Sequence, residues 1–318
     1  IRIGQMSGDG AYLEKGKRFR LDLNEEPGTK TRAPLPHPEI FDVLQKGADL
    51  LLNDGRIRLT VDKTGKGFAE TVVLTGGTLT DYKGVNVPNT VVPVSAVTTR
   101  DRDNLQFALD HSVDWIALSF VQRPDDVEEA NRLVNGRAAL MVKVERPAAL
   151  DCIDEIIDLA DGVMVARGDL GVELQSSEIP LIQKKLVAKA KKSRIPVIIA
   201  TQMMESMMES VTPSRAEVND VANSVMDGAD AVMLSGETSV GKFPTEVIKT
   251  MSSIINKVEN SNLISLANKR PKDQKSKRYI TKSICFSAAK MANDIKAKAI
   301  STLTNSGYTA FQISSWRP

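Results

Sequence analysis

Short apolar runs alternate with amphipathic stretches through the middle of the chain. The apolar runs lie at 113–120, 138–145, 161–166, 195–202 and 229–236. Helical spacing of apolar residues follows each run, at 125–134, 148–159, 178–193, 214–227 and 244–258. This alternation is typical of a parallel sheet with crossover helices, which buries its strands on both faces. The pattern predicts either a (β/α)8 barrel or a doubly wound α/β sheet.

Polar residues stand at the carboxyl end of each of these runs. They form the stretches SFVQR, KVER, ARGD, ATQ and LSGET. The carboxyl ends of barrel strands meet at one face, where a barrel enzyme carries its active site. A doubly wound sheet concentrates its chemistry at one switch point instead. We therefore predict a barrel of the TIM type over residues 96–260.

The flanking regions follow other patterns. Residues 6–95 contain alternating strand patterns such as RFRLDL and FAETVVL, with turn signals such as NDG and TGKG, and predict a compact β domain. Beyond residue 260, the basic stretch NKRPKDQKSKRY predicts a solvated linker. ITKSICFSAAKMAND then predicts a helix, and KAKAISTLTNSGYTAFQISSWRP a further β-loop-helix unit.

Composition narrows the functional classes. The net charge of +2 and the 4% aromatic content give little support for nucleic-acid binding. No apolar run is long enough to cross a bilayer and no signal peptide opens the sequence. Cys152 and Cys285 are far apart, and His37 and His111 lack partners, so neither a zinc site nor a histidine triad is expected. Two unpaired cysteines predict a reducing, cytoplasmic setting.

The stretch MVKVERP places two opposite charges in an apolar strand. Strand side chains alternate between faces, so Lys143 and Glu145 share one face while Val142 and Val144 share the other. One interpretation is an amphipathic edge strand with a solvated face. The other is a strand that delivers a cation and an anion into one polar site.

Three longer stretches closely resemble the pyruvate kinase family. They are MVARGDLGVE at 164–173, ATQMMESM at 200–207 and SRAEVNDVANSVMDGADAVMLSGET at 214–238. KVERP fits the family's catalytic strand, which more often reads K-I-E-N or K-I-E-K-P, and the resemblance extends from residue 1 to residue 318. It implies a (β/α)8 barrel with an inserted β-barrel lid domain at 6–95 and a partial α/β C-terminal regulatory domain at 261–318. Residues 1–5 would end a barrel strand.

The resemblance also assigns the catalytic residues. Glu145 and Asp169 would hold Mg²⁺ or Mn²⁺, since paired carboxylates with substrate oxygens suit these ions. Lys143 would place its ammonium over the phosphoryl group in transit. The amides of Gly168 and Asp169 would bind the substrate carboxylate. Thr201, otherwise a structural cap, would lie on the proton path to the substrate methylene, where a water chain supplies the proton because a hydroxyl is a weak base.

Further residues are assigned supporting roles. Gln202, Ser235 and Glu237 would support the proton network, whereas Arg167 is either a structural ion pair or a substrate contact. Arg2, at the barrel–lid junction, and Lys83, in the lid loop YKGVNVP, would pair with nucleotide phosphates. Arg215 opens a helix, where a cation is unfavourably placed relative to the positive end of the helix dipole, which suggests a specific partner. In the family, this region forms a subunit interface of a homotetramer. The loop at 302–309 resembles the family's effector-phosphate loop, with these candidate residues: Thr302, Thr304, Asn305, Ser306, Gly307 and Thr309.

The implied function is a glycolytic phosphotransferase, pyruvate kinase, which moves the phosphoryl group of phosphoenolpyruvate to ADP. A metal-dependent aldolase or phosphoenolpyruvate mutase is the alternative enzyme, and would not need the lid or Lys143. A non-catalytic fragment is the third hypothesis, because the family's barrel begins before Ile1 and its C-terminal domain continues beyond residue 318. The earlier part carries an arginine and the ligands of the family's K⁺ ion. Without about two and a half strands of the barrel, this chain alone is expected to fold poorly and to be inactive, because strand edges would be left unpaired.

Overall fold

A parallel sheet of five strands forms the centre of the molecule. The computed structural model describes residues 1–88, 90, 96–261, 271, 275–316 and 318. The strands are β9 (Trp115–Leu118), β10 (Ala139–Val144), β11 (Gly162–Ala166), β12 (Val197–Ala200) and β13 (Ala231–Met233). Their order, β13-β12-β11-β10-β9, makes strands adjacent in the chain adjacent in the sheet. This single winding is that of a barrel wall and confirms the incomplete barrel over the doubly wound alternative.

Helices follow the strands at the positions that the sequence predicts, with four additions. The helices of this region are α2 (Thr99–Asp110), α3 (Pro124–Val134), α4 (Pro147–Asp151), α5 (Ile153–Leu159), α6 (Arg167–Glu173), α7 (Ile179–Ser193), η1 (Glu205–Met208), α8 (Arg215–Asp227), α9 (Gly236–Ser239) and α10 (Pro244–Glu259). The helix expected at 148–159 is interrupted at Cys152. α2, α6, η1 and α9 were not predicted; α2 begins at a capping box formed by Thr98 and Asp101.

The two faces of the sheet have different environments. Val142 and Val144 of β10 belong to the large core shared with the helices. Met141 lies on the opposite face with Met164 and Ala200, in a small separate cluster. This alternation confirms that Lys143 and Glu145 share the face turned away from the helices, as a barrel interior requires.

The β domain has its own hydrophobic core. Its elements are β1 (Ala11–Leu13), β2 (Arg18–Asp22), β3 (Arg32–Pro34), α1 (Pro38–Val43), β4 (Asp49–Leu52), β5 (Ile57–Gly65), β6 (Phe68–Thr75), β7 (Gly77–Leu79) and β8 (Val85–Asn86). Six strands form a sheet in the order β3-β2-β6-β5-β4-β8, and β1 pairs with β7. Residues 1–5, expected to end a barrel strand, instead pair with this domain: Ile3 is buried in its core, and the Ile3 amide donates to the Lys83 carbonyl at 3.0 Å.

The C-terminal residues form a helical pair. α11 (Tyr279–Asp294) packs against α12 (Tyr308–Ser314), with an edge-on contact between Phe286 and Trp316 at 5.0 Å. The strand expected between them does not form in residues 296–307. An extended segment becomes a strand only beside a partner strand, and none lies next to it among the described residues. Half of the predicted linker, residues 268–270 and 272–274, lies outside the described residues.

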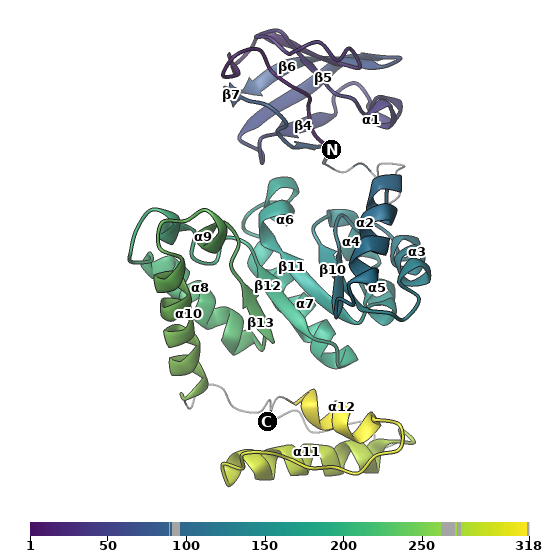
Figure 1. Ribbon diagram of the computed structural model, residues 1–318, viewed down its shortest axis with the longest axis vertical. Helices are drawn as coiled ribbons and strands as arrows, with labels where there is room; N and C mark the ends of the chain where they lie inside the picture. The colour runs from purple at the N-terminus through teal and green to yellow at the C-terminus, as the bar shows by residue number, and fades with distance from the viewer. Residues whose placement is uncertain (89, 91–95, 262–270, 272–274, 317) are drawn as a thin grey trace.

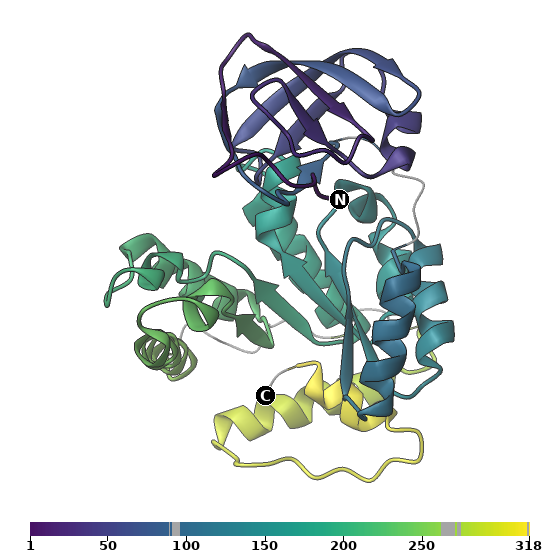
Figure 2. The same ribbon diagram turned by 45° about the horizontal axis from the view of Figure 1, so that its top comes forward.

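The β domain and the C-terminal helices lie at opposite ends of the molecule (Figure 1). Figure 2, turned from that view, shows α6 beneath the β domain, at the carboxyl ends of the sheet strands. None of the helices in the described ranges is long and apolar enough to cross a membrane. The polar strand ends are therefore placed under the β domain.

Candidate functional site

The carboxyl ends of β9 and β10 are joined by a buried charge pair. Lys143 forms an ion pair with Glu145, whose side chain is 1% exposed, and the Lys143 Nζ donates to the Ser119 Oγ at 2.9 Å. The Phe120 amide donates to the Glu145 Oε2 at 2.9 Å. A carboxylate this deeply buried needs such partners, because burial penalises an unpaired charge. The pair belongs to a polar site, not to a solvated edge.

Asp169 has a different environment. No described residue donates a hydrogen bond to its carboxylate. Its pKa is raised, chiefly by burial and then by the negative charge of Glu145, while Lys143 lowers it and Asp54 of the β domain raises it. Repulsion by Glu145 places the two carboxylates near one another, at the ends of the neighbouring strands β10 and β11.

This pair of carboxylates fits a divalent cation. Oxygen donors are those that Mg²⁺ and Mn²⁺ prefer, and a cation here would relieve the repulsion that acts on Asp169. No cluster of three or more acidic, histidine or cysteine ligands occurs among the described residues. Substrate oxygens and water would therefore complete the coordination that Glu145 and Asp169 begin.

Residues that follow β11 and β12 hold one another in place. The Gly168 amide donates to the Thr201 Oγ1 at 2.6 Å, and Arg167 donates to the Thr201 and Gln202 carbonyls at 2.9 and 3.4 Å. Arg167 also pairs with Asp220 of α8 at 2.7 Å. These contacts place Arg167 in an ion pair, and they leave its buried Nε without a hydrogen bond.

The backbone after β12 is left-handed at two consecutive residues. Thr201 has φ of 70° and Gln202 has φ of 53°. This conformation is costly for a β-branched residue, and such strain is found where surrounding contacts hold it. Arg167 and Gly168 supply those contacts. Gly168 leaves room for them, because a Cβ there would lie 3.1 Å from the Thr201 Oγ1.

Glu237 and Ser235 lie on the last strand end. The Glu237 carboxylate, 3% exposed, accepts from the Met204 amide at 3.1 Å and from the Ser235 amide at 2.8 Å. Both acceptor oxygens are thus used to join the loops after β12 and β13. The geometry assigns Glu237 a supporting position behind Thr201.

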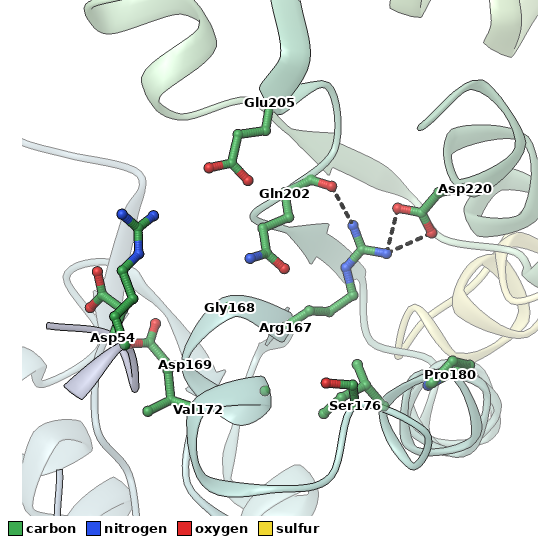
Figure 3. Close-up of a pocket in the computed structure, with 13 residues that line it drawn as sticks. Asp54, Arg167, Gly168, Asp169, Val172, Ser176, Pro180, Gln202, Glu205 and Asp220 are labelled. Atoms are coloured by element: carbon green, nitrogen blue, oxygen red, sulfur yellow. Dashed lines mark hydrogen bonds and ion pairs between the residues drawn. The ribbon is translucent and has the colours of Figure 1, made fainter. Parts of the chain in front are cut away.

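A cavity of about 620 Å³ opens beside these residues (Figure 3). Its lining includes Gly168, Asp169 and Gln202 of the barrel, together with Asp54 and Arg56 from the turn between β4 and β5. Figure 3 shows Asp54 beside Asp169 and Arg167 turned toward Asp220. The β domain therefore contributes directly to the cavity.

Arg2 and Lys83 lie together at the edge of the β domain, outside this cavity lining. Arg2 forms a β-bridge with Gly84, and its Nη1 donates to the Tyr82 carbonyl at 2.8 Å. Arg215 is exposed at the start of α8.

In the C-terminal region a second cavity, of about 400 Å³, is lined by Thr304, Asn305, Ser306 and Thr309, whereas Thr302 and Gly307 do not line it. Arg278 contributes to this lining, and its guanidinium stacks on the Tyr308 ring at 4.1 Å.

Several residues of the site were missed by the sequence analysis. Ser119 and Phe120 contact the charged pair from β9, and their signal was available in the polar strand end SFVQR. Asp54 lay in the turn signal NDG, where three consecutive residues adopt positive φ. Asp220 had no local signal, because its role depends on Arg167 from another strand.

Comparisons with known proteins agree with this geometry. The family model described as pyruvate kinase, barrel domain, matches residues 1–248, and the pyruvate kinase alpha/beta domain matches residues 282–318. The pyruvate kinase of Methylorubrum extorquens is 44% identical over the whole chain, and that of Geobacillus stearothermophilus is 41% identical. The chain spans 66% of the former and 55% of the latter. A crystal structure of a pyruvate kinase from Cryptosporidium parvum superimposes with a TM-score of 0.85 at 33% identity, covering the whole chain and 67% of that protein.

Proposed function

Because this chain belongs to the pyruvate kinase family, we propose that the whole protein transfers the phosphoryl group of phosphoenolpyruvate to ADP, giving pyruvate and ATP. The observation that carries the proposal is the buried Lys143–Glu145 pair at the end of β10, facing Asp169. It places one cation and two anions at the mouth of the barrel, beneath a domain that can cover them.

Glu145 and Asp169 would hold the divalent ion. When bound, that ion supplies positive charge to the substrate oxygens and orients them. Lys143 stays paired with Glu145 and the Ser119 hydroxyl until substrate enters, so its ammonium is fixed in position. A fixed cation stabilises the charge of a phosphoryl group in transit, and this is the main requirement of phosphoryl transfer.

The substrate carboxylate would be bound by the amides of Gly168 and Asp169. The Gly168 amide now donates to the Thr201 hydroxyl, so substrate would share or replace that contact. Loss of the phosphoryl group leaves the enolate of pyruvate, which takes a proton on its methylene carbon. We assign Thr201 to this proton path, with Gln202, Ser235 and Glu237 holding its loop.

The nucleotide would enter from the β domain, where Arg2 and Lys83 offer cations to its phosphates. The remaining features stay predictions from the sequence: a cytoplasmic homotetramer with an interface near Arg215, and a K⁺ ion held outside this chain. An effector phosphate is proposed for the loop at 302–309, where Arg278 adds a cation to the hydroxyl-rich cavity.

The proposal is tested by assaying the intact protein with phosphoenolpyruvate, ADP and Mg²⁺. Replacing Lys143 with Met should lower phosphoryl transfer by on the order of 10³-fold, the scale of removing a transition-state cation. Exchange of the methyl protons of pyruvate, which needs no phosphoryl transfer, should largely persist. Lys189→Met is the matched control, since Lys189 on α7 pairs with the exposed Asp154 on α5.

Two outcomes would overturn parts of this assignment. Turnover of phosphoenolpyruvate without ADP would favour the mutase or aldolase alternative. Equal loss of both activities in Lys143→Met, with metal still bound, would make Lys143 the proton donor or a general scaffold.

A further inference from the structure

The Glu173 carboxylate links the β domain to the barrel. The Glu173 Oε1 accepts from the Arg146 Nη1 at 2.5 Å and from the Asn86 Nδ2 at 3.0 Å. The Arg146 and Glu173 side chains are 9% and 3% exposed. Among the residues that the structure describes, the Asn86 contact is the hydrogen bond that links residues 11–88 to residues 97–260.

The barrel half of this junction connects the two metal-binding segments. Arg146 directly follows Glu145, and Glu173 ends α6, the helix that carries Asp169. Their ion pair therefore ties together the chain segments on which both carboxylates stand. Because both charges are buried, removing either one leaves the other without compensation, so breaking the pair is costly.

The β-domain half lies in the last strand of that domain. Asn86 is in β8, and the neighbouring Val85 amide donates to the Ile1 carbonyl at 3.1 Å. Asn86 also lies opposite Leu51 of β4, whose turn brings Asp54 and Arg56 to the cavity. A contact held on both sides by these buried or paired segments moves less than the far end of the β domain when that domain rotates.

We propose that Glu173 is a positioning residue and the pivot of the β domain. Its ion pair with Arg146 sets the spacing of the Glu145 and Asp169 segments, while its hydrogen bond with Asn86 restricts the β domain to one axis of rotation above them. The inference rests on the proposed function in assuming that the β domain closes over the site.

The test separates the two contacts in the intact protein. Asn86→Ala and Asn86→Asp should broaden the distribution of distances between spin labels on the β domain and on the barrel, measured without ligands. The aspartate should broaden it more, because it repels Glu173. Loss of one hydrogen bond should also raise the KM for ADP about three- to tenfold, with a smaller change in kcat. Mn²⁺ affinity should stay unchanged in Asn86→Ala.

Glu173→Gln should show the opposite pattern. It keeps an acceptor for Asn86 and loses the charge partner of Arg146, so Mn²⁺ affinity should fall several-fold while the distance distribution stays narrow. Asn24→Ala is the matched control, since the Asn24 amide donates within the β domain, to Glu26. A wild-type distribution in both Asn86 variants would overturn the pivot, as would equal broadening in Glu173→Gln. The label distances require no catalysis, so they decide the pivot even if phosphoryl transfer is absent.

Discussion

At the scale of single residues, the two carboxylates of the site differ in their partners: Glu145 has a cation and a hydrogen-bond donor beside it, whereas Asp169 has no hydrogen bond from the described residues. Glu145 is nearly inaccessible to solvent and is matched by Lys143 and the Phe120 amide. Asp169 faces it with no hydrogen bond from the described residues and with a raised pKa. The site thus carries an excess of negative charge that a cation would neutralise.

Removing either carboxylate should weaken metal binding. Glu145→Gln and Asp169→Asn should each reduce Mn²⁺ affinity by more than the roughly 10–100-fold typical of losing a second-sphere partner, because a ligand itself is lost. Titration calorimetry or the electron paramagnetic resonance signal of free Mn²⁺ measures this. Asp154→Asn, an exposed carboxylate on α5, is the control. Wild-type titrations in both site variants would remove the assignment.

The raised pKa of Asp169 has a consequence for stability in metal-free protein. The folded protein binds this proton more tightly than the unfolded chain does, so the free energy of unfolding falls as pH rises from the ordinary value of 3.8 through the raised pKa. Above that pKa, the ionised Asp169 carboxylate lowers the free energy of unfolding by its full amount. Asp169→Asn should therefore be more stable than wild type at pH 7, and the advantage should shrink as the pH falls toward 3.8.

Chemical unfolding with chelator, at several pH values, measures this difference. Added Mg²⁺ should then stabilise wild type more than Asp169→Asn, because only the wild type keeps both ligands. A pH-independent difference between the two proteins would contradict the electrostatic cause.

At the scale of elements, three contacts hold the loop after β12 in place. Arg167 fixes its carbonyls, the Gly168 amide contacts the Thr201 hydroxyl, and Glu237 binds the Met204 amide. The contacts come from β11 and β13, the neighbours of β12 in the sheet. The loop keeps two left-handed residues because these neighbouring strand ends hold it.

Thr201→Ala should separate the proton step from phosphoryl transfer. Loss of the hydroxyl should slow exchange of pyruvate methyl protons by about 10²-fold, the lower range of acid–base contributions, and phosphoryl transfer by less. Deuterium incorporation followed by NMR, beside a coupled kinase assay, measures both steps. Thr201→Ser keeps the hydroxyl without the β-branch and should retain exchange. Equal effects on both steps would show that Thr201 only holds the loop.

At the scale of the whole molecule, two hydrophobic cores meet at a polar boundary. The β domain and the barrel bury separate clusters, and the cavity between them is lined largely by polar side chains. Domains with separate cores and polar interfaces are expected to move relative to one another.

The β domain should therefore rotate as a rigid body when nucleotide and Mg²⁺ bind. Label pairs within the β domain should keep their distance, whereas pairs between Lys66 in the β5–β6 turn and Asp158 of α5 should shorten. Double electron–electron resonance on cysteine variants of those exposed positions measures both. One unchanged interdomain distance with and without ligands would contradict lid closure.

The sequence by itself determined the secondary-structure elements and the polar residues that stand at the ends of the strands. Apolar periodicity predicted the five strands and most of the helices, and alternation within MVKVERP placed Lys143 and Glu145 on one face. These predictions succeeded because periodicity is local: a strand or helix sets the direction of each side chain from its own position.

Tertiary structure decided which distant residues meet. Asp220 joins Arg167, Asp54 faces Asp169 and Asn86 reaches Glu173 only because separate strands and domains converge. The strand expected near residues 296–303 failed for the same reason, since a strand needs a partner and its own residues supply only half of each hydrogen bond. Contacts between residues far apart in the chain are set by packing, which no local pattern of side chains encodes.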